Sequence, residues 1–175
     1  MRLEKDFFLQ HPKVVAKKLL GKIIVRRING EELKAKIVET EAYYGREDPA
    51  SRARQNGDLR KTMEMDAGTI LVYGVHNNWL VNFVTEEEGK ASAVLIRAVE
   101  PLNFEEKCNG PGLLTKALKI DKTFHKKDVF GEEFFIIENE EGDFEIIESF
   151  RIGVKEDLDE KLRFYIKDNK FISKK

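Results

Sequence analysis

The sequence predicts a single α+β domain covering residues 1–175, with a bent antiparallel or mixed β-sheet and a few short helices. The length of 175 residues is typical of one domain. Short β-rich segments separated by turn signals run through most of the chain, whereas only two segments show a helical pattern of apolar residues. No internal repeat or linker divides the chain, so the strands are expected to share one sheet.

The first part of the chain is predicted to form a helix followed by two paired strands. Pro12–Leu20 begins with a proline, which suits the first helical position, and Gly21 suits the stop that follows it. Asn29-Gly30 is a strong signal for a tight hairpin turn. The β-rich segment Lys22–Ile28 is therefore expected to pair with Leu33–Tyr43.

The rest of the chain is predicted to hold one long loop, one more helix and six more strands. Asp48–Asp66 is polar and irregular, and a loop of this length is usually functional or disordered. Pro111–Lys119 carries leucines on one side and is expected to be a helix. The predicted strands are Thr69–Val75, Trp79–Thr85, Ser92–Val99, Phe134–Glu138, Phe144–Arg151 and Leu162–Ile166.

Composition excludes several classes of protein. Hydrophobic residues make up 41% of the chain, which excludes disorder as its main state. No apolar run approaches the ~20 residues that span a bilayer, and the charged start Met1–Asp6 does not resemble a signal peptide. The single cysteine, Cys108, forms neither an internal disulfide nor a cysteine-based zinc site. We therefore expect a reducing compartment inside the cell, such as the cytoplasm or nucleus.

Basic and acidic residues are segregated along a chain whose net charge is −1. This balance excludes a nucleic-acid binder of the uniformly basic type. Gly131–Phe150 is acidic, and other segments are basic, so one face is expected to be locally positive and to attract phosphates. The alternative is that the charges are ordinary solvated faces. The candidate phosphate contacts are Lys17, Lys18, Arg26, Arg27 and the stretch Lys116–Lys127.

Charged residues interrupt two of the predicted apolar strand faces. Alternation places Glu39 and Glu41 on a face that begins as core, where burial raises a carboxyl pKa toward the range of a general base. Arg97 falls among apolar residues of Ser92–Val99, where an arginine needs a partner. We expect Arg97 to pair with Glu41 or Glu39. A structural ion pair is the ordinary interpretation, and an acid–base site is the alternative.

Aromatic residues near these charges suggest a pocket for a planar group. Tyr43 follows Glu41 closely, and Tyr73 lies in a short β segment near His76. Such tyrosines either stack on a base or serve as half-buried residues of the sheet. His76 has no His, Cys or acidic neighbour at metal-ligand spacing, and the chain lacks phosphate-binding and nucleophile motifs. No metal or cofactor is expected.

Specific sequence blocks follow one another in a fixed order from about residue 12 to the end. The most specific are Ile37-Val38-Glu39-Thr40-Glu41-Ala42-Tyr43 and Arg97-Ala98-Val99-Glu100-Pro101. The others are Ala16–Lys22, Asp48–Ser51, Gly68–Tyr73, Asn109–Gly112, Arg151–Val154 and Leu162–Tyr165. In this order the blocks resemble those of the alkyladenine (3-methyladenine) DNA glycosylase family.

The resemblance implies a monofunctional glycosylase of base excision repair that acts on double-stranded DNA. Such an enzyme flips a damaged purine out of the duplex and excises it, leaving an abasic site. The implied bases are alkylated or deaminated purines, among them 3-methyladenine, 7-methylguanine, hypoxanthine and ethenoadenine. A monomer that needs no membrane is expected.

The resemblance also implies roles for particular residues. Glu41 resembles the general base that activates water for attack on the sugar C1′. Arg97 and the backbone carbonyl of Ile152 match positions that hold this water. Among the residues that contact the base, the aromatic walls match Tyr43 and Tyr73, and the asparagine that discriminates against the guanine amino group matches Asn82.

Three departures from the family pattern affect this interpretation. The loop between Ser51 and Gly68 departs from the usual Pro-Arg-Asn stretch, although Arg60 and Lys61 are still placed to contact phosphate. Arg52 stands where the family usually has a histidine. An arginine side chain offers only hydrogen-bond donors, although it can still stack on a base. The set of purines that the enzyme accepts is therefore expected to change.

The segment Gly74–Trp79 lacks the usual Tyr-Gly pair, so His76 is the nearest candidate for the wedge that fills the flipped base's place. Asn77 and Trp79 are its rivals. These departures also fit a non-catalytic protein that binds damaged DNA, which is the alternative function.

Overall fold

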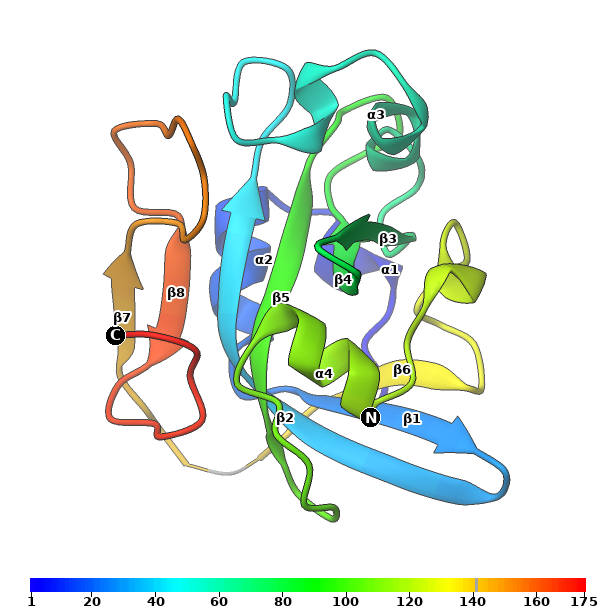
Figure 1. Ribbon diagram of the computed structural model, residues 1–175. Coiled ribbons are helices and arrows are strands. Elements are labelled where there is room, and N and C mark those ends of the chain that lie inside the picture. Colours follow the sequence, from blue (N-terminus) through cyan, green and yellow to red (C-terminus); the bar gives the residue numbers. More distant parts are fainter. Residues whose placement is uncertain (141) are drawn as a thin grey trace.

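A curled antiparallel β-sheet of eight strands organises the protein (Figure 1). The computed structural model describes residues 1–140 and 142–175. The strands are β1 (Ile23–Ile28), β2 (Glu31–Tyr43), β3 (Ile70–Val75), β4 (Asn78–Val84), β5 (Ala93–Pro101), β6 (Phe134–Ile137), β7 (Ile146–Ser149) and β8 (Arg163–Ile166). Six of them follow the order β3-β4-β5-β2-β1-β6, and β8 pairs with both β2 and β7. The α+β prediction is confirmed, and every strand pair in the described ranges is antiparallel rather than mixed.

Strand β2 is the 13-residue spine of the sheet. One of its edges pairs with β5, and its other edge pairs first with β1 and then, from Glu39, with β8. The register against β5 shifts between Ile37 and Thr40, which marks a β-bulge. The Thr40 hydroxyl donates to the carbonyl of Ala16 (2.8 Å), so this face of the strand packs on the helix Pro12–Leu19. The opposite face carries the glutamates that approach Arg97.

The helices are short, and in Figure 1 the helix that begins at Pro12 lies behind β2 and β5, whereas the helix that begins at Pro111 lies in front, against β4 and β5. Both predicted helices are confirmed as α2 and α4, each beginning at its proline. No helix in the described ranges is both long and apolar enough to cross a membrane. The helices are α1 (Lys5–Phe8), α2 (Pro12–Leu19), α3 (Asp58–Met63) and α4 (Pro111–Ala117), with 3₁₀ turns η1 (Arg52–Arg54) and η2 (Lys122–Phe124).

The structure corrects two predicted elements. Asp48–Asp66 is not irregular throughout, because it contains η1 and α3. Helix α3 is held by burial of Thr62 and Met63, and six residues are too few to show a helical period in the sequence. The strand expected over Phe144–Arg151 is only Ile146–Ser149, since Phe144 and Phe150 are exposed beyond its ends.

Candidate active site

An open cavity of about 1110 Å³ lies where the end of β2, the β3–β4 hairpin and three loops meet. Tyr43 and Arg97 line it from the sheet, and Tyr73 and His76 line it from the hairpin. The remaining walls come from residues 49–60, from the start of α4 at residues 110–113, and from residues 152–156. Together with Arg97 on β5, segments spread along the chain from Tyr43 to Glu156 thus converge on one site.

Glu41 lies against the floor of this cavity without lining it, and its side chain is fully buried. The Tyr43 hydroxyl donates to Glu41 Oε1 (2.8 Å), and Arg97 Nη1 lies 3.4 Å from the same oxygen. The Ile152 N–H donates to Glu41 Oε2 (2.8 Å). The expected pairing of Arg97 is observed, since it contacts Glu41 and also lies 3.7 Å from Glu39. All three partners of Glu41 line the cavity.

The surroundings of Glu41 favour a carboxyl group that exchanges protons. Burial raises the pKa of Glu41 above the ordinary value, although Arg97, the Ile152 N–H and Tyr43 each lower it. A carboxylate has about four acceptor positions, and three of them are occupied here. The remaining position is on Oε2.

Ile152 contacts Glu41 directly through its backbone N–H, which donates to the carboxylate. This hydrogen bond fixes the loop of residues 152–156 against the end of β2. The role of its carbonyl in holding water stays a prediction.

The two predicted aromatic walls face the cavity, and each carries an arginine. The Arg151 guanidinium lies 4.6 Å from the centroid of the Tyr43 ring, and that of Arg52 lies 4.7 Å from the Tyr73 ring. Burial raises the pKa of both tyrosines, so their hydroxyls remain protonated donors. Arg52 is exposed and lines the cavity, where it presents donors beside Tyr73.

Asn82 does not line the cavity, in contrast to the other predicted base contacts. It is buried on β4, where its Nδ2 donates to the Leu71 carbonyl (3.2 Å). Against the larger raising effect of burial, its side chain also lowers the pKa of the Tyr73 hydroxyl, so the two side chains are close together. The structure therefore places Asn82 behind the Tyr73 wall, as a support for that ring.

His76 is at the tip of the β3–β4 hairpin, and it is exposed and lines the cavity. His76 (φ 49°) and Asn77 (φ 64°) both have left-handed backbone, as in the tight primed turns of hairpins. Non-glycine residues pay a strain for this conformation, and such strain is common at functional sites. Of the three wedge candidates, His76 faces the cavity, whereas Asn77 and Trp79 do not line it.

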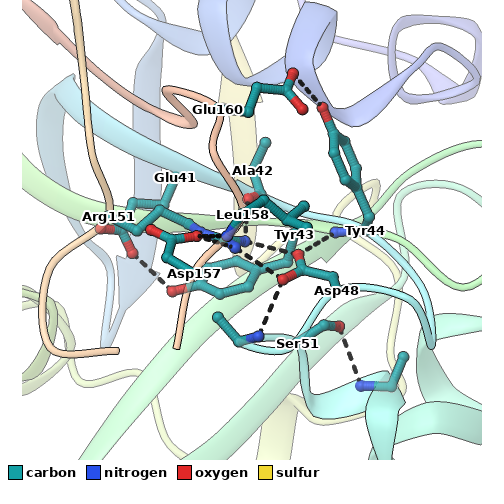
Figure 2. A network of polar contacts seen from close by, with 12 residues as sticks. Glu41, Ala42, Tyr43, Tyr44, Asp48, Ser51, Arg151, Asp157, Leu158 and Glu160 are labelled. Atoms are coloured by element: carbon teal, nitrogen blue, oxygen red, sulfur yellow. Dashed lines mark hydrogen bonds and ion pairs between the residues drawn. The ribbon is translucent and has the colours of Figure 1, made fainter. Parts of the chain in front are cut away.

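A buried arginine that sequence reasoning did not single out organises the wall next to Glu41. Figure 2 shows Arg151 held by two carboxylates, those of Asp48 and Asp157. Its Nη1 and Nη2 atoms are each 2.7 Å from an Asp48 oxygen, and Nη2 also donates to Asp157. Arg151 Nη1 donates to the Ala42 carbonyl (3.0 Å) as well. Because Arg151 directly precedes Ile152 and stacks on Tyr43, this cluster fixes two of the partners of Glu41. Asp48 and Arg151 lay in matched sequence blocks, but no pattern paired them.

Among the predicted phosphate contacts, only Arg60 lines the cavity, and most of the cavity's positive charge comes from other residues. Lys17 pairs with Glu148, and Arg27 pairs with Glu32 and Glu132. Arg26 is largely buried and donates to backbone carbonyls. The basic residues that line the cavity are Arg52, Arg54, Arg60, Arg97 and Lys155, together with His76. Within the described ranges, no group of three His, Cys, Asp or Glu residues is arranged to hold a metal ion.

Together these features define an acid–base site for a planar group. A buried carboxyl with a raised pKa, an arginine beside it and two aromatic walls meet in one cavity with a basic rim. This combination is suited to acid–base chemistry on a stacked planar base.

Comparison with known proteins identifies the family. The family model described as methylpurine-DNA glycosylase (MPG) matches residues 6–170. A protein of Aeropyrum pernix is 42% identical over 98% of this chain and 93% of its own length. A protein of Legionella pneumophila (strain Corby) is 45% identical over 99% of this chain and 98% of its own length. One of Clostridium perfringens (strain 13) is 41% identical over both full lengths.

All three relatives carry the name "Putative 3-methyladenine DNA glycosylase". The chain belongs to the methylpurine-DNA glycosylase family. The family places it among the DNA glycosylases of DNA repair, with base excision as the expected pathway.

Proposed function

We propose that the protein is a monofunctional glycosylase that hydrolyses the bond between C1′ and a damaged purine in double-stranded DNA. The observation that carries the proposal is the buried Glu41 carboxyl, bonded to Tyr43, Arg97 and Ile152 at the floor of the cavity. The proposed bases are alkylated or deaminated purines, namely 3-methyladenine, 7-methylguanine, hypoxanthine and ethenoadenine. The protein is proposed to act as a monomer inside the cell, without a cofactor.

In the proposed mechanism Glu41 acts on a water molecule in the cavity. The flipped purine stacks between Tyr43 and Tyr73, with its C1′ near the floor. The remaining acceptor position on Glu41 Oε2 takes a proton as the water oxygen attacks C1′. The bond from C1′ to the base nitrogen breaks, and the base leaves with its electron pair. Arg97 stabilises the carboxylate before the proton arrives.

The product is expected to be an intact strand with an abasic site. A glycosylase that cleaves the strand uses an amine that forms a Schiff base with C1′. Lys155 is the one lysine among the residues that line the cavity, and it is exposed at the rim.

The function is tested by single-turnover base release from duplexes that carry either alkylated adenine or hypoxanthine. Release should leave strands that break only after alkali, and borohydride should trap no covalent adduct. The preferred base reports the effect of Arg52, whose donors face the cavity. Tight binding of both duplexes without any release would favour the alternative, a protein that only recognises damage.

The His76→Ala variant is expected to release base about tenfold more slowly, because one stacking contact with DNA is worth roughly 1–3 kcal/mol. The physical reason is loss of the side chain that replaces the flipped base in the stack. Asn77→Ala, at the neighbouring turn position that does not line the cavity, is the matched control. Equal rates for the two variants would remove His76 from the wedge role.

Arg54→Ala and Lys155→Ala are each expected to weaken duplex binding and to reduce the slope of log K against log salt by about one. Both residues are exposed at the rim of the cavity. Lys17→Ala is the control, since Lys17 pairs with Glu148 away from the cavity. The measurement is duplex binding from low to moderate salt concentration. If only Lys17→Ala reduced the slope of log K against log salt, the DNA would bind to another face of the protein.

A further inference from the structure

The C-terminal segment of the chain, residues 172–174, lies on Glu39, two residues before Glu41. The Ser173 N–H donates to Glu39 Oε1 (2.6 Å), and Arg163 Nη1 donates to Glu39 Oε2 (2.9 Å). Arg163 Nη1 also donates to the Lys174 carbonyl (2.8 Å). The Glu39 side chain is fully buried, so these contacts satisfy it where water does not reach. In Figure 1 this segment curls back beside β7 and β8.

The segment is anchored by its own packing as well as by Glu39. Ile172 is buried in the main core, and Phe171 packs against the same core. Asn169 Oδ1 accepts from the Phe171 N–H (2.8 Å), and Asn169 Nδ2 donates to Glu100 (3.2 Å). These contacts therefore hold the Ser173 N–H next to Glu39.

Arg97 lies between two carboxylates and is bonded to only one of them. Its Nη1 is 3.4 Å from Glu41 Oε1, whereas its Nε is 3.7 Å from Glu39 Oε2. Nε is buried and has no hydrogen-bond partner among the described residues. Glu39 Oε2, the oxygen that Nε approaches, accepts a hydrogen bond from the cationic Arg163, and Oε1 accepts one from the Ser173 N–H. Arg163 and the C-terminal segment thus offset the charge of Glu39 and weaken its attraction for Arg97.

We propose that the C-terminal segment is a positioning element of the active site: by occupying Glu39 through the Ser173 N–H and Arg163, it keeps the Arg97 guanidinium on Glu41. The inference rests on the proposed function for its effect on catalysis. Its geometric part, which carboxylate Arg97 contacts, Glu41 or Glu39, does not depend on that function. Ser173 and Arg163 are positioning residues, because neither lines the cavity.

Loss of the Ser173 N–H should change the titration of Glu41. The groups that face Glu41 are Tyr43 and Glu39 on β2, Arg97 on β5, the Ile152 N–H on its loop, and Tyr73 on β3. Among them Arg97 is the charge that lowers the pKa of Glu41, against the raising effect of burial. If Arg97 moves to Glu39, the pKa of Glu41 rises further, and the acidic limb of the pH–rate profile moves to higher pH.

Ser173→Pro tests this directly, because proline lacks the N–H that Glu39 accepts. Ser173→Ala keeps the N–H and removes only a buried hydroxyl that has no partner in the described ranges. In the Ser173→Pro protein we expect Glu41 to titrate about one pH unit higher than in the native protein, because loss of a neighbouring opposite charge has an effect of this size. Ser173→Ala should titrate like the native protein. Carboxyl ¹³C NMR measures the titration, and single-turnover base release measures the acidic limb.

Equal Glu41 titrations in the proline and alanine variants would overturn the proposal. If Ser173→Pro does not fold, Arg163→Lys decides instead, because it keeps the positive charge but loses the planar fork that joins Glu39 to the Lys174 carbonyl. A raised Glu41 titration in that variant supports the proposal, and an unchanged or lowered one overturns it. The NMR readout needs no base release, so a native protein that releases no base would refute the proposed function and leave this test intact.

Discussion

Glu41→Gln is expected to reduce single-turnover base release by about 10²–10⁴-fold, the usual contribution of a general base. Glutamine keeps the shape of the side chain but accepts no proton at neutral pH. Binding of damaged duplex should be retained, because Glu41 lies behind Tyr43, Arg97 and Ile152 rather than in the lining of the cavity. The variant therefore separates the proton transfer from the recognition of DNA.

The control for this prediction is Glu88→Gln, which removes a carboxylate from an exposed turn. It should release base at the native rate from duplexes with alkylated adenine and with hypoxanthine. If Glu41→Gln retained native release, the water would have to be activated by another group, and the proposed mechanism would be wrong.

Glu41→Gln also has a predicted effect on the stability of the protein. Because burial raises the pKa of Glu41 in the folded state, ionised Glu41 costs stability once the pH exceeds the unfolded pKa of roughly 4.3. The cost grows as the pH rises toward the folded pKa and is then constant. Glu41→Gln removes this cost but also takes away the carboxylate that Arg97 contacts, so at pH 7 it should lower the free energy of unfolding less than Asp48→Asn does. A lost activity with an intact fold can then be attributed to chemistry.

The parts of the fold that sequence reasoning could predict depend on local signals. Pro12 and Pro111 mark the starts of α2 and α4, and Asn29-Gly30 marks the β1–β2 turn. Helix α3 carries no such signal, because its six residues are stabilised by the burial of Thr62 and Met63 against other segments. The bulge in β2 was equally hidden, since a register shift depends on the partner strand.

The candidate site was only partly predictable for a related reason. Glu41 and Arg97 violate the apolar pattern of their strands, so each is visible in the sequence alone. Arg151 and Asp48 are 103 residues apart and lie outside the named strands, where no alternation exists to be violated. The contact of Ser173 with Glu39 spans 134 residues and uses a backbone N–H, which every residue except proline possesses.

The Arg151 cluster should provide the largest single effect on stability. Asp48→Asn is expected to lower the free energy of unfolding by about 3–5 kcal/mol, because it leaves a buried arginine without its bidentate partner. The side chains of both Asp48 and Arg151 are fully buried, whereas Asp157 is 19% exposed. Asp157→Asn should therefore cost less, and Asp159→Asn, at an exposed position, should cost little. Urea unfolding at pH 7 measures all three.

The pH dependence of the cluster supplies an independent check with a definite sign. Burial opposes ionisation of Asp48, but hydrogen bonds from Arg151 and from the Tyr44 and Ala50 N–H groups lower its pKa below the ordinary value. Its contribution to stability is complete above the unfolded pKa of roughly 3.9 and is lost as the pH falls through the lower folded pKa. The difference between native protein and Asp48→Asn should thus shrink on acidification. A constant difference would mean that the variant fails through packing, and that the ion pair is not what holds Arg151 beneath Tyr43 and beside Ile152.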